Sequence, residues 1–170
     1  MKKWMLGLWL VVLGLLVPGV CIIKSIQFDQ ECAGFLKQAA DANTAELALE
    51  RVNLALDYIE ANKLTDGYTS VMWRTEDENI GYWYRNIKAC QGELEGCLEA
   101  TPLEKSNVLM KVRESLTDEG EKGTKLTIPD GISRYPYNAA WGWARLISYI
   151  ILFAGIVFVC WGIDEEENRF

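Results

Sequence analysis

Histidine is absent from this 170-residue chain, and so are the short motifs that mark the commoner enzyme classes. Without histidine, the most frequent general base and one of the main zinc ligands are missing. The sequence contains no P-loop, no dinucleotide-binding glycine fingerprint and no nucleophile elbow. We therefore expect a protein that is not an enzyme and that carries no cofactor.

Positive charge is also scarce, because 17 lysines and arginines stand against 24 acidic residues, a net charge of −7. Such a balance argues against nucleic acid as a partner and against docking to anionic lipid through charge. The most acidic cluster, Glu76, Asp77 and Glu78, could in principle bind calcium. It lacks the ligand spacing and the glycine of an EF-hand loop, so we interpret these acids as residues of a helix start.

The five cysteines include no C-x-x-C pair, so we predict no metal site. Cys90 and Cys97 are seven residues apart on one predicted helix, about 10.5 Å along its axis, and cannot pair with each other. Cys32 can pair with one of them in an oxidising compartment, and its expected height in the fold favours Cys90. Cys21 and Cys160 fall within apolar runs and are interpreted as small apolar residues.

What the chain does contain is two long apolar runs without a charged residue, residues 4–23 and residues 146–163. Eighteen helical residues span about 27 Å, close to the thickness of a bilayer's hydrocarbon core. Trp141, Trp143 and Trp161 stand where interfacial aromatic belts are expected. We predict two transmembrane helices, at residues 1–23 and 141–163, with the bilayer itself as the first partner.

The first run has a second interpretation, as a secretion signal or a lipoprotein signal that ends at Cys21. Its length exceeds that of a usual signal, no A-x-A cleavage site follows, and Val20 occupies a position where lipoproteins carry a small residue. A retained span is therefore the favoured interpretation. Lys2 and Lys3 then favour cytoplasmic termini. We expect a bacterial inner (plasma) membrane protein with an extracytoplasmic central domain.

Between the spans, apolar residues at helical spacing predict helices near residues 25–42, 44–62, 75–97 and 102–116. Capping pairs mark three of the starts: Asn43 with Glu46, Thr75 with Glu78, and Thr101 with Glu104. No turn signal separates the first helix from the first span, so the two are expected to be continuous. The predicted fold is an all-α membrane protein in which two transmembrane helices flank an up-down-up-down bundle.

The predicted parts of the chain follow from these elements. They are a first span at residues 1–23, a helical extramembrane domain at 24–117, a linker at 118–140, a second span at 141–163 and an acidic tail at 164–170. Pro129, Asp130 and Gly131 form a turn signal between short β-prone runs, which predicts a small hairpin within the linker.

The stretch MWRTEDENIGYWYRN, residues 72–86, combines aromatic and acidic residues in the manner of a binding site. Trp83 belongs to a heptad seam that continues to Cys97, so it is predicted to be core, whereas Tyr82 points away. An even number of bundle helices places Met72 and Trp73 at the membrane end. There they are expected to plug the bundle or, alternatively, to touch the membrane interface.

Small residues recur every seven positions in both apolar runs: Gly7, Gly14 and Cys21 in the first, and Ser148, Gly155 and Gly162 in the second. Such seams let transmembrane helices approach closely. We hypothesise that the two seams pack against each other, with Gly7 level with Gly162 and Gly14 level with Gly155. A seam that faces a partner, or chance, is the alternative.

For function we expect an accessory or scaffold subunit that contacts a membrane or extracytoplasmic protein partner. Contact is expected at Tyr82 and at a small-residue face made of Gly81, Gly92 and Gly96. A ligand-sensing bundle is the alternative, since the two-span layout is loosely similar in architecture to the sensory part of bacterial chemoreceptors. A sensor needs a concave pocket with converging polar groups, which distinguishes the two hypotheses.

Overall fold

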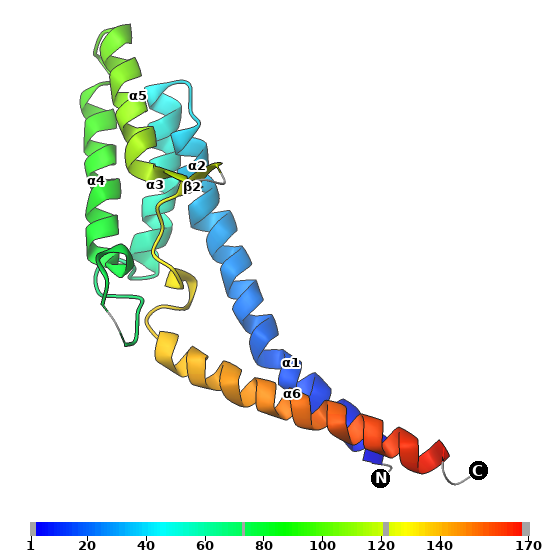
Figure 1. The fold of residues 1–170 in the computed structure, drawn as a ribbon. Helices are drawn as coiled ribbons and strands as arrows, with labels where there is room; N and C mark the ends of the chain where they lie inside the picture. The colour runs from blue at the N-terminus through cyan, green and yellow to red at the C-terminus, as the bar shows by residue number, and fades with distance from the viewer. Residues whose placement is uncertain (1–2, 73, 121–122, 168–170) are drawn as a thin grey trace. The chain divides into compact units, whose positions relative to one another are not determined.

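The computed structural model describes residues 3–72, 74–120 and 123–167, and the chain divides into two compact units. The first, the helical pair, consists of Met1–Ser25 and Tyr137–Phe170. The second, the bundle domain, is Ile26–Pro136. The chain is mainly helical with a small two-stranded hairpin, as the sequence predicts (Figure 1).

The helical pair is formed by α1 (Lys3–Phe28) up to Ser25 and by α6 (Asn138–Glu167). Both helices are long and apolar enough to cross a membrane. The two helices run antiparallel. Lys3 pairs with Glu165 at 2.7 Å at one end of the pair, and Lys24 lies over the Trp141 ring at 5.9 Å at the other end. Both charged contacts are solvent-exposed or at the helix ends, where such contacts contribute little to stability.

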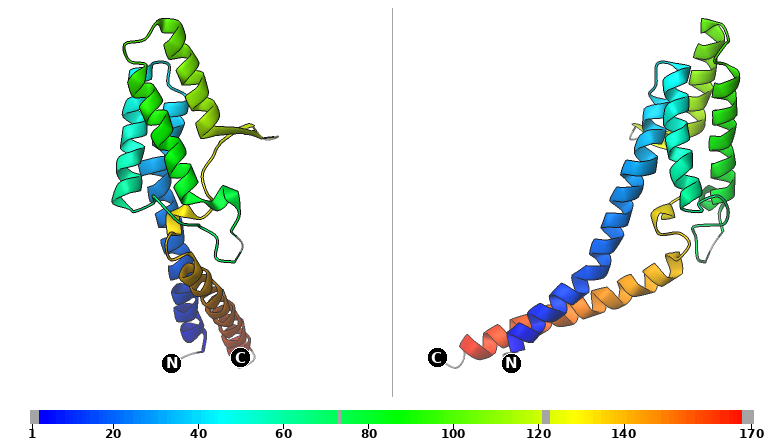
Figure 2. Two further views of the ribbon diagram at one scale, coloured as in Figure 1. Left: turned by 90° about the vertical axis from the view of Figure 1, so that its left-hand side faces the viewer. Right: turned by 180° about the vertical axis from the view of Figure 1, so that it is seen from behind.

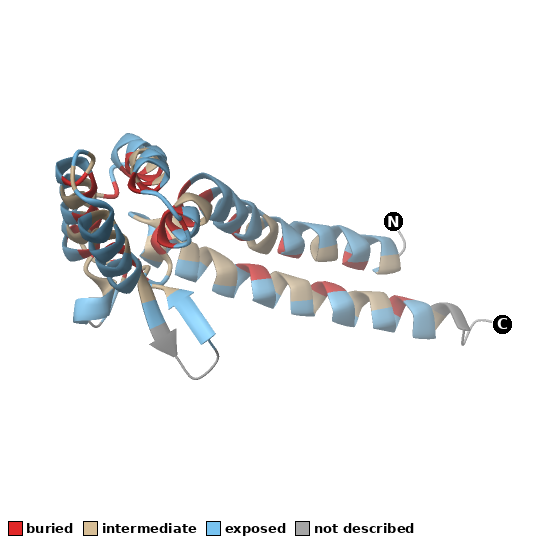
Figure 3. Ribbon diagram, turned by 90° about the horizontal axis from the view of Figure 1, so that it is seen from above, coloured by how far each residue is buried: buried red, intermediate tan, exposed pale blue. Residues whose placement is uncertain are grey.

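The contact between these two helices consists of small residues. Along α1 up to Ser25 and along α6, the buried residues in the described part of the chain are the six seam residues: Gly7, Gly14, Cys21, Ser148, Gly155 and Gly162. Figure 3 shows them as red segments that recur along each helix. Ser148 Oγ also donates a hydrogen bond to the backbone oxygen of Gly14 at 2.5 Å. Since neither seam carries a bulky side chain, the two backbones approach closely.

The axial register of this contact differs from the predicted one. A Cβ added to Gly7 would lie 2.7 Å from Val159 N and 2.8 Å from Gly155 O, rather than beside Gly162. In the same way Gly14 faces Leu152 at 2.8 Å, three residues before the predicted Gly155. The predicted register is therefore wrong by about one helical turn. Periodicity identifies which faces meet but not how far one helix has slid along the other.

The bundle domain contains the end of α1, the π-helical segment η1 (Asp29–Ala33), α2 (Gly34–Ala40), α3 (Ala45–Ala61), α4 (Ile80–Gly96) and α5 (Pro102–Leu116). Helical residues follow one another without a break from Lys3 to Ala40. Within the domain α2 packs on α3 and α5, and α4 packs on the same two helices, which closes a four-membered bundle (Figure 2). The α2–α3 and α4–α5 connections are short, whereas residues 62–79 join α3 to α4, and successive helices alternate in direction.

The bundle core is apolar and centred on the predicted heptad seam of α4. Ile80, Trp83, Ile87, Cys90, Leu94 and Cys97 are all buried, which confirms that seam. From the facing helices, Leu36, Val52, Ile59 and Val112 are at most 1% exposed. Across the outside of α3 and α4, Lys88 pairs with Glu60 at 2.9 Å and the Tyr84 hydroxyl donates to the same carboxylate.

Two of the predicted helix starts are displaced by a residue or more. Thr44, not Asn43, caps α3, since its hydroxyl accepts a hydrogen bond from Leu47 N at 3.2 Å. The Thr75–Glu78 capping box is present, but it encloses only the 3-10 turn η2 (Glu76–Glu78). The α4 helix itself begins at Ile80, capped by Asn79. The predicted Thr101 box and Pro102 start of α5 are confirmed.

The hairpin lies earlier in the chain than predicted. Strand β1 (Thr117–Gly120) pairs antiparallel with β2 (Gly123–Leu126), so Thr117 lies opposite Leu126. The Pro129-Asp130-Gly131 signal does form a turn, with Ile132 N donating to Pro129 O at 3.3 Å and Gly131 at φ 74°. That turn leads into the 3-10 segment η3 (Ile132–Arg134) rather than joining two strands. Leu126 at the end of β2 and Ile128 just after it pack on the core.

Candidate functional site

A groove of about 720 Å³ lies in the bundle domain between the start of α4, the end of α5 and the segment that follows β2. Its apolar base is formed by the buried residues Trp83, Ile87 and Leu116. Tyr82, 56% exposed, lines the groove beside them. The groove is the largest of the hollows described for this chain, and it coincides with the stretch in which the sequence combines aromatic and acidic residues.

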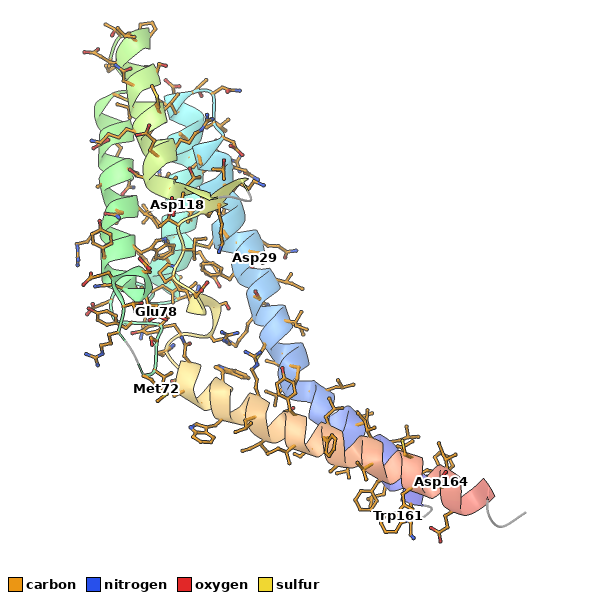
Figure 4. All side chains as sticks on the ribbon, in the orientation of Figure 1. Asp29, Met72, Glu78, Asp118, Trp161 and Asp164 are labelled. Carbon is orange, nitrogen blue, oxygen red and sulfur yellow. The ribbon has the colours of Figure 1, made fainter. Side chains whose placement is uncertain are left out.

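The groove is strongly acidic. Five carboxylates line it, those of Glu76, Asp77, Glu78, Asp118 and Asp130, against the single ammonium group of Lys125. Figure 4 labels Glu78 on η2 and Asp118 on β1. Lys125 lies directly opposite Asp118 in the hairpin. Within the described ranges Glu76, Asp77 and Asp130 form no ion pair, and their negative charges remain available to a ligand.

Local structure explains why Tyr82 faces outward beside an inward-facing Trp83. The Asn79 side chain accepts a hydrogen bond from Tyr82 N at 2.9 Å and donates one to the Tyr68 hydroxyl at 3.2 Å. These two bonds fix the first turn of α4. Adjacent residues on a helix point about 100° apart, so burying Trp83 turns Tyr82 toward the groove. The Asn79 cap that starts α4 therefore also positions Tyr82.

The predicted small-residue face is only partly available, and it is separate from the groove. Gly81 is buried, and a Cβ there would lie 3.1 Å from Asp66 Oδ1, which corrects the expectation that it faces a partner. Gly92 and Gly96 are exposed, with nothing within 4 Å of an added Cβ. Gly92 is ten residues beyond Tyr82, about 15 Å along α4, so the structure does not unite these candidates in one site.

The α3–α4 loop does not plug the bundle with Met72. That side chain is 78% exposed, and Val71 beside it is 61% exposed, so the plugging interpretation is wrong for Met72. The corresponding hypothesis for Trp73 lies outside the described residues. By contrast, Tyr135 lies next to this loop, since its hydroxyl donates to Asp66 O at 2.8 Å.

Cys32 and Cys90 are both buried in the bundle core, and all five cysteines are free thiols in the structure. Burial raises the pKa of the Cys32 thiol from 9.0 to about 12, and burial is also the main cause of a raised pKa at Cys90. Since the thiolate is the reactive form, both groups are unreactive while the domain is folded. Pairing of Cys32 with Cys90 stays a prediction.

The raised pKa of Cys32 leads to a measurable expectation. A pKa of about 12 in place of 9.0 lowers the thiolate fraction near neutral pH by about a thousandfold. Alkylation of Cys32 by iodoacetamide at pH 8 should therefore be slower in the folded chain than in urea by orders of magnitude. The two alkylation rates are measured by peptide mass spectrometry. Equal rates in the folded chain and in urea would contradict the buried placement of Cys32. If Cys32 and Cys90 both resist alkylation in the denatured chain before reduction, they are paired in a disulfide.

Comparison with known proteins identifies no relative: no family model, no curated protein and no solved structure matches this chain. Over the described residues, no three cysteine, aspartate or glutamate side chains gather closely enough to hold a metal ion. The acids of the groove are spread over η2, β1 and the segment after β2. The acids therefore distribute negative charge along the groove rather than around one point.

Proposed function

We propose that this chain is a two-span membrane protein whose bundle domain binds a protein partner through the acidic groove beside Tyr82, as a non-catalytic accessory or scaffold subunit. The groove is the observation that carries the proposal. It joins an apolar base, an exposed tyrosine and unpaired carboxylates on one domain, and tyrosine is enriched at protein interfaces. Charge complementarity selects a partner segment rich in lysine or arginine.

The membrane part of the proposal is supported by the surface of the helical pair. Only 17% of each apolar stretch is buried inside the protein, whereas the core helix of a soluble protein is mostly buried. The exposed side chains include Trp9 at 69% and Phe153 at 71%. An apolar surface of this length is stable only when lipid or another apolar partner covers it.

The proposed orientation places both termini in the cytoplasm and the bundle domain outside it, in a bacterial inner membrane. It rests on Lys2 and Lys3 and on the two-span count. The proposed parts of the chain remain the two spans, the bundle, the linker that contains the hairpin and the acidic tail.

A second function is favoured by the size of the groove. A volume of about 720 Å³ falls within the range of small-molecule sites, and its polar groups converge on an apolar base. The bundle would then sense a small organic cation of the polyamine class. We rank this second because four of the five acids are solvent-exposed, and exposed charges bind a small cation weakly.

The test is affinity purification of the full chain in mild detergent, with mass spectrometry of the proteins that accompany it. The groove variant combines Y82A, E76Q and D77N. The matched control combines M110A, D57N and E99Q, because Met110 is as exposed as Tyr82, 56%, and Asp57 and Glu99 are exposed acids elsewhere on the bundle. A basic partner retained by the wild type and the control but lost from the groove variant is the expected result.

The outcomes separate the two functions. A partner that stays with all three proteins rejects the groove as its site, and no partner with the wild type rejects the interaction role. Titration with spermidine and with a lysine-rich peptide, each followed by Tyr and Trp fluorescence, then tests the alternative. Binding of spermidine in preference to the peptide, lost in the groove variant, would favour the sensor.

A further inference from the structure

The tip of the α3–α4 loop presents a small apolar surface to solvent. Val71 is 61% exposed and Met72 is 78% exposed, the highest value for a large apolar side chain in the described part of the chain. The other strongly exposed apolar residues after α2 in the bundle domain, such as Leu103 and Met110, are not adjacent in sequence. Figure 4 labels Met72 at the end of its loop.

The neck of this loop is held by a network of hydrogen bonds. Thr69 N donates to Glu78 O at 3.0 Å, and Ile80 N donates to Gly67 O at 2.9 Å. Tyr68 forms a β-bridge with Asn79, and Leu64 at the start of the loop is buried. The exposed tip is therefore carried by a defined base and is not the frayed end of a helix.

The loop lies at the end of the bundle domain where the chain enters and leaves it. Phe28, on the entry side, packs edge-on against Tyr58 near the end of α3, with ring centroids 6.0 Å apart. On the exit side the Tyr135 hydroxyl donates to Asp66 O, and its ring lies against Gly67. The α4–α5 connection lies at the opposite end of the same domain (Figures 1 and 2).

Only a short stretch of chain joins this end of the bundle domain to α6. Tyr135 precedes Asn138, the first residue of α6, by three residues, a reach of at most about 11 Å. Val71 follows Asp66 by five residues, a further reach of at most about 18 Å. Each interfacial layer of a bilayer is about 5–8 Å thick. These maximum lengths, with the Tyr135 side chain between them, permit the loop tip to meet the interfacial layer of a membrane that contains α6.

From these observations we infer that Val71 and Met72 insert into the interfacial layer of the bilayer that α6 crosses, and so anchor the bundle domain to the membrane surface. The inference rests on the proposed spanning role of α6. The contact is apolar rather than electrostatic, which accords with a chain of net charge −7. No carboxylate occurs in residues 67–75, and Arg74, placed over the Tyr68 ring at 5.4 Å, suits the headgroup region.

The experiment places an environment-sensitive dye at one of three positions of the full chain in phosphatidylcholine vesicles. The variants are M72C, L103C and I150C, each with C160A so that the exposed native thiol is removed while the buried thiols stay protected. Leu103 is the matched control, because it is 72% exposed and lies in the first turn of α5, at the opposite end of the bundle. Nitroxide-labelled lipids quench dyes that contact the bilayer.

Strong quenching and a blue shift at position 72 and at position 150, with neither at position 103, is the expected result. No quenching at position 72 while position 150 is quenched overturns the loop anchor and leaves the membrane-spanning role intact. Equal quenching at 72 and 103 also overturns it, since the whole domain would then lie on the surface. No quenching at position 150 rejects the spanning role of α6 itself, and the loop anchor with it.

Discussion

Replacing Gly155 with leucine will disrupt the packing of α1 against α6. A Cβ at this position would lie 2.8 Å from Val11 N and 3.0 Å from Gly7 O, atoms of the opposing backbone that no side-chain rotation can move. The helices must therefore slide or part. Overpacking of this kind costs about 1–3 kcal/mol, which reduces the packed population by about fivefold or more.

The measurement is the distance between spin labels at two exposed positions of the helical pair, V12C on α1 and I150C on α6, in the C160A background. We expect a narrow distribution for the parent and a broad, longer one for G155L. The control is G19L or G142L, because an added Cβ at either glycine meets nothing within 4 Å. If G155L keeps the narrow distribution of its controls, the small-residue seam does not hold the helices together.

The largest effect on the bundle domain is expected for Leu94→Ala. Leu94 is fully buried on the α4 seam, so its truncation removes apolar contacts and leaves a cavity. Such substitutions lower the free energy of unfolding by about 2–5 kcal/mol. The same substitution at Leu103, which is 72% exposed, should change it by less than about 0.5 kcal/mol.

Urea titration of the full chain in detergent will distinguish the two variants, with reactivity of the buried Cys32 and Cys90 thiols as the probe of unfolding. Both thiols are inaccessible in the folded domain, so their labelling reports on the bundle and not on the helical pair. A clear fall in the midpoint for L94A alone is expected. Equal midpoints for L94A and L103A would show that the α4 seam is not the stabilising core.

Several parts of the fold could be predicted because they depend on periodicity or on local capping. Apolar residues at heptad spacing identified the buried face of α4, and Thr101 with Pro102 identified the start of α5. Short-range hydrogen bonds decide such features. The start of α4 was misplaced for a related reason, since the Thr75 box closes a 3-10 turn and Asn79, four residues later, caps the helix.

The candidate site was predictable only in part. Tyr82 could be singled out because it lies off the seam, but its neighbours in the groove come from residues 115–118 and 125–130, far along the chain. The strands that bring Asp118 and Lys125 there were expected elsewhere, because a Pro-Asp-Gly signal marks a turn without specifying which segments pair across it. Met72 was misassigned because residue type does not reveal whether a loop side chain folds inward.

By itself, therefore, the sequence determined the two long apolar helices, the helical character of the domain between them, and the faces on which small and apolar residues gather. All of these depend on spacing along one helix. Tertiary structure alone decided the axial register of the two seams, because a repeat of seven residues leaves the faces matched when one helix slides by about a turn. It also decided the groove, in which segments distant in sequence surround Tyr82 once the bundle core has packed.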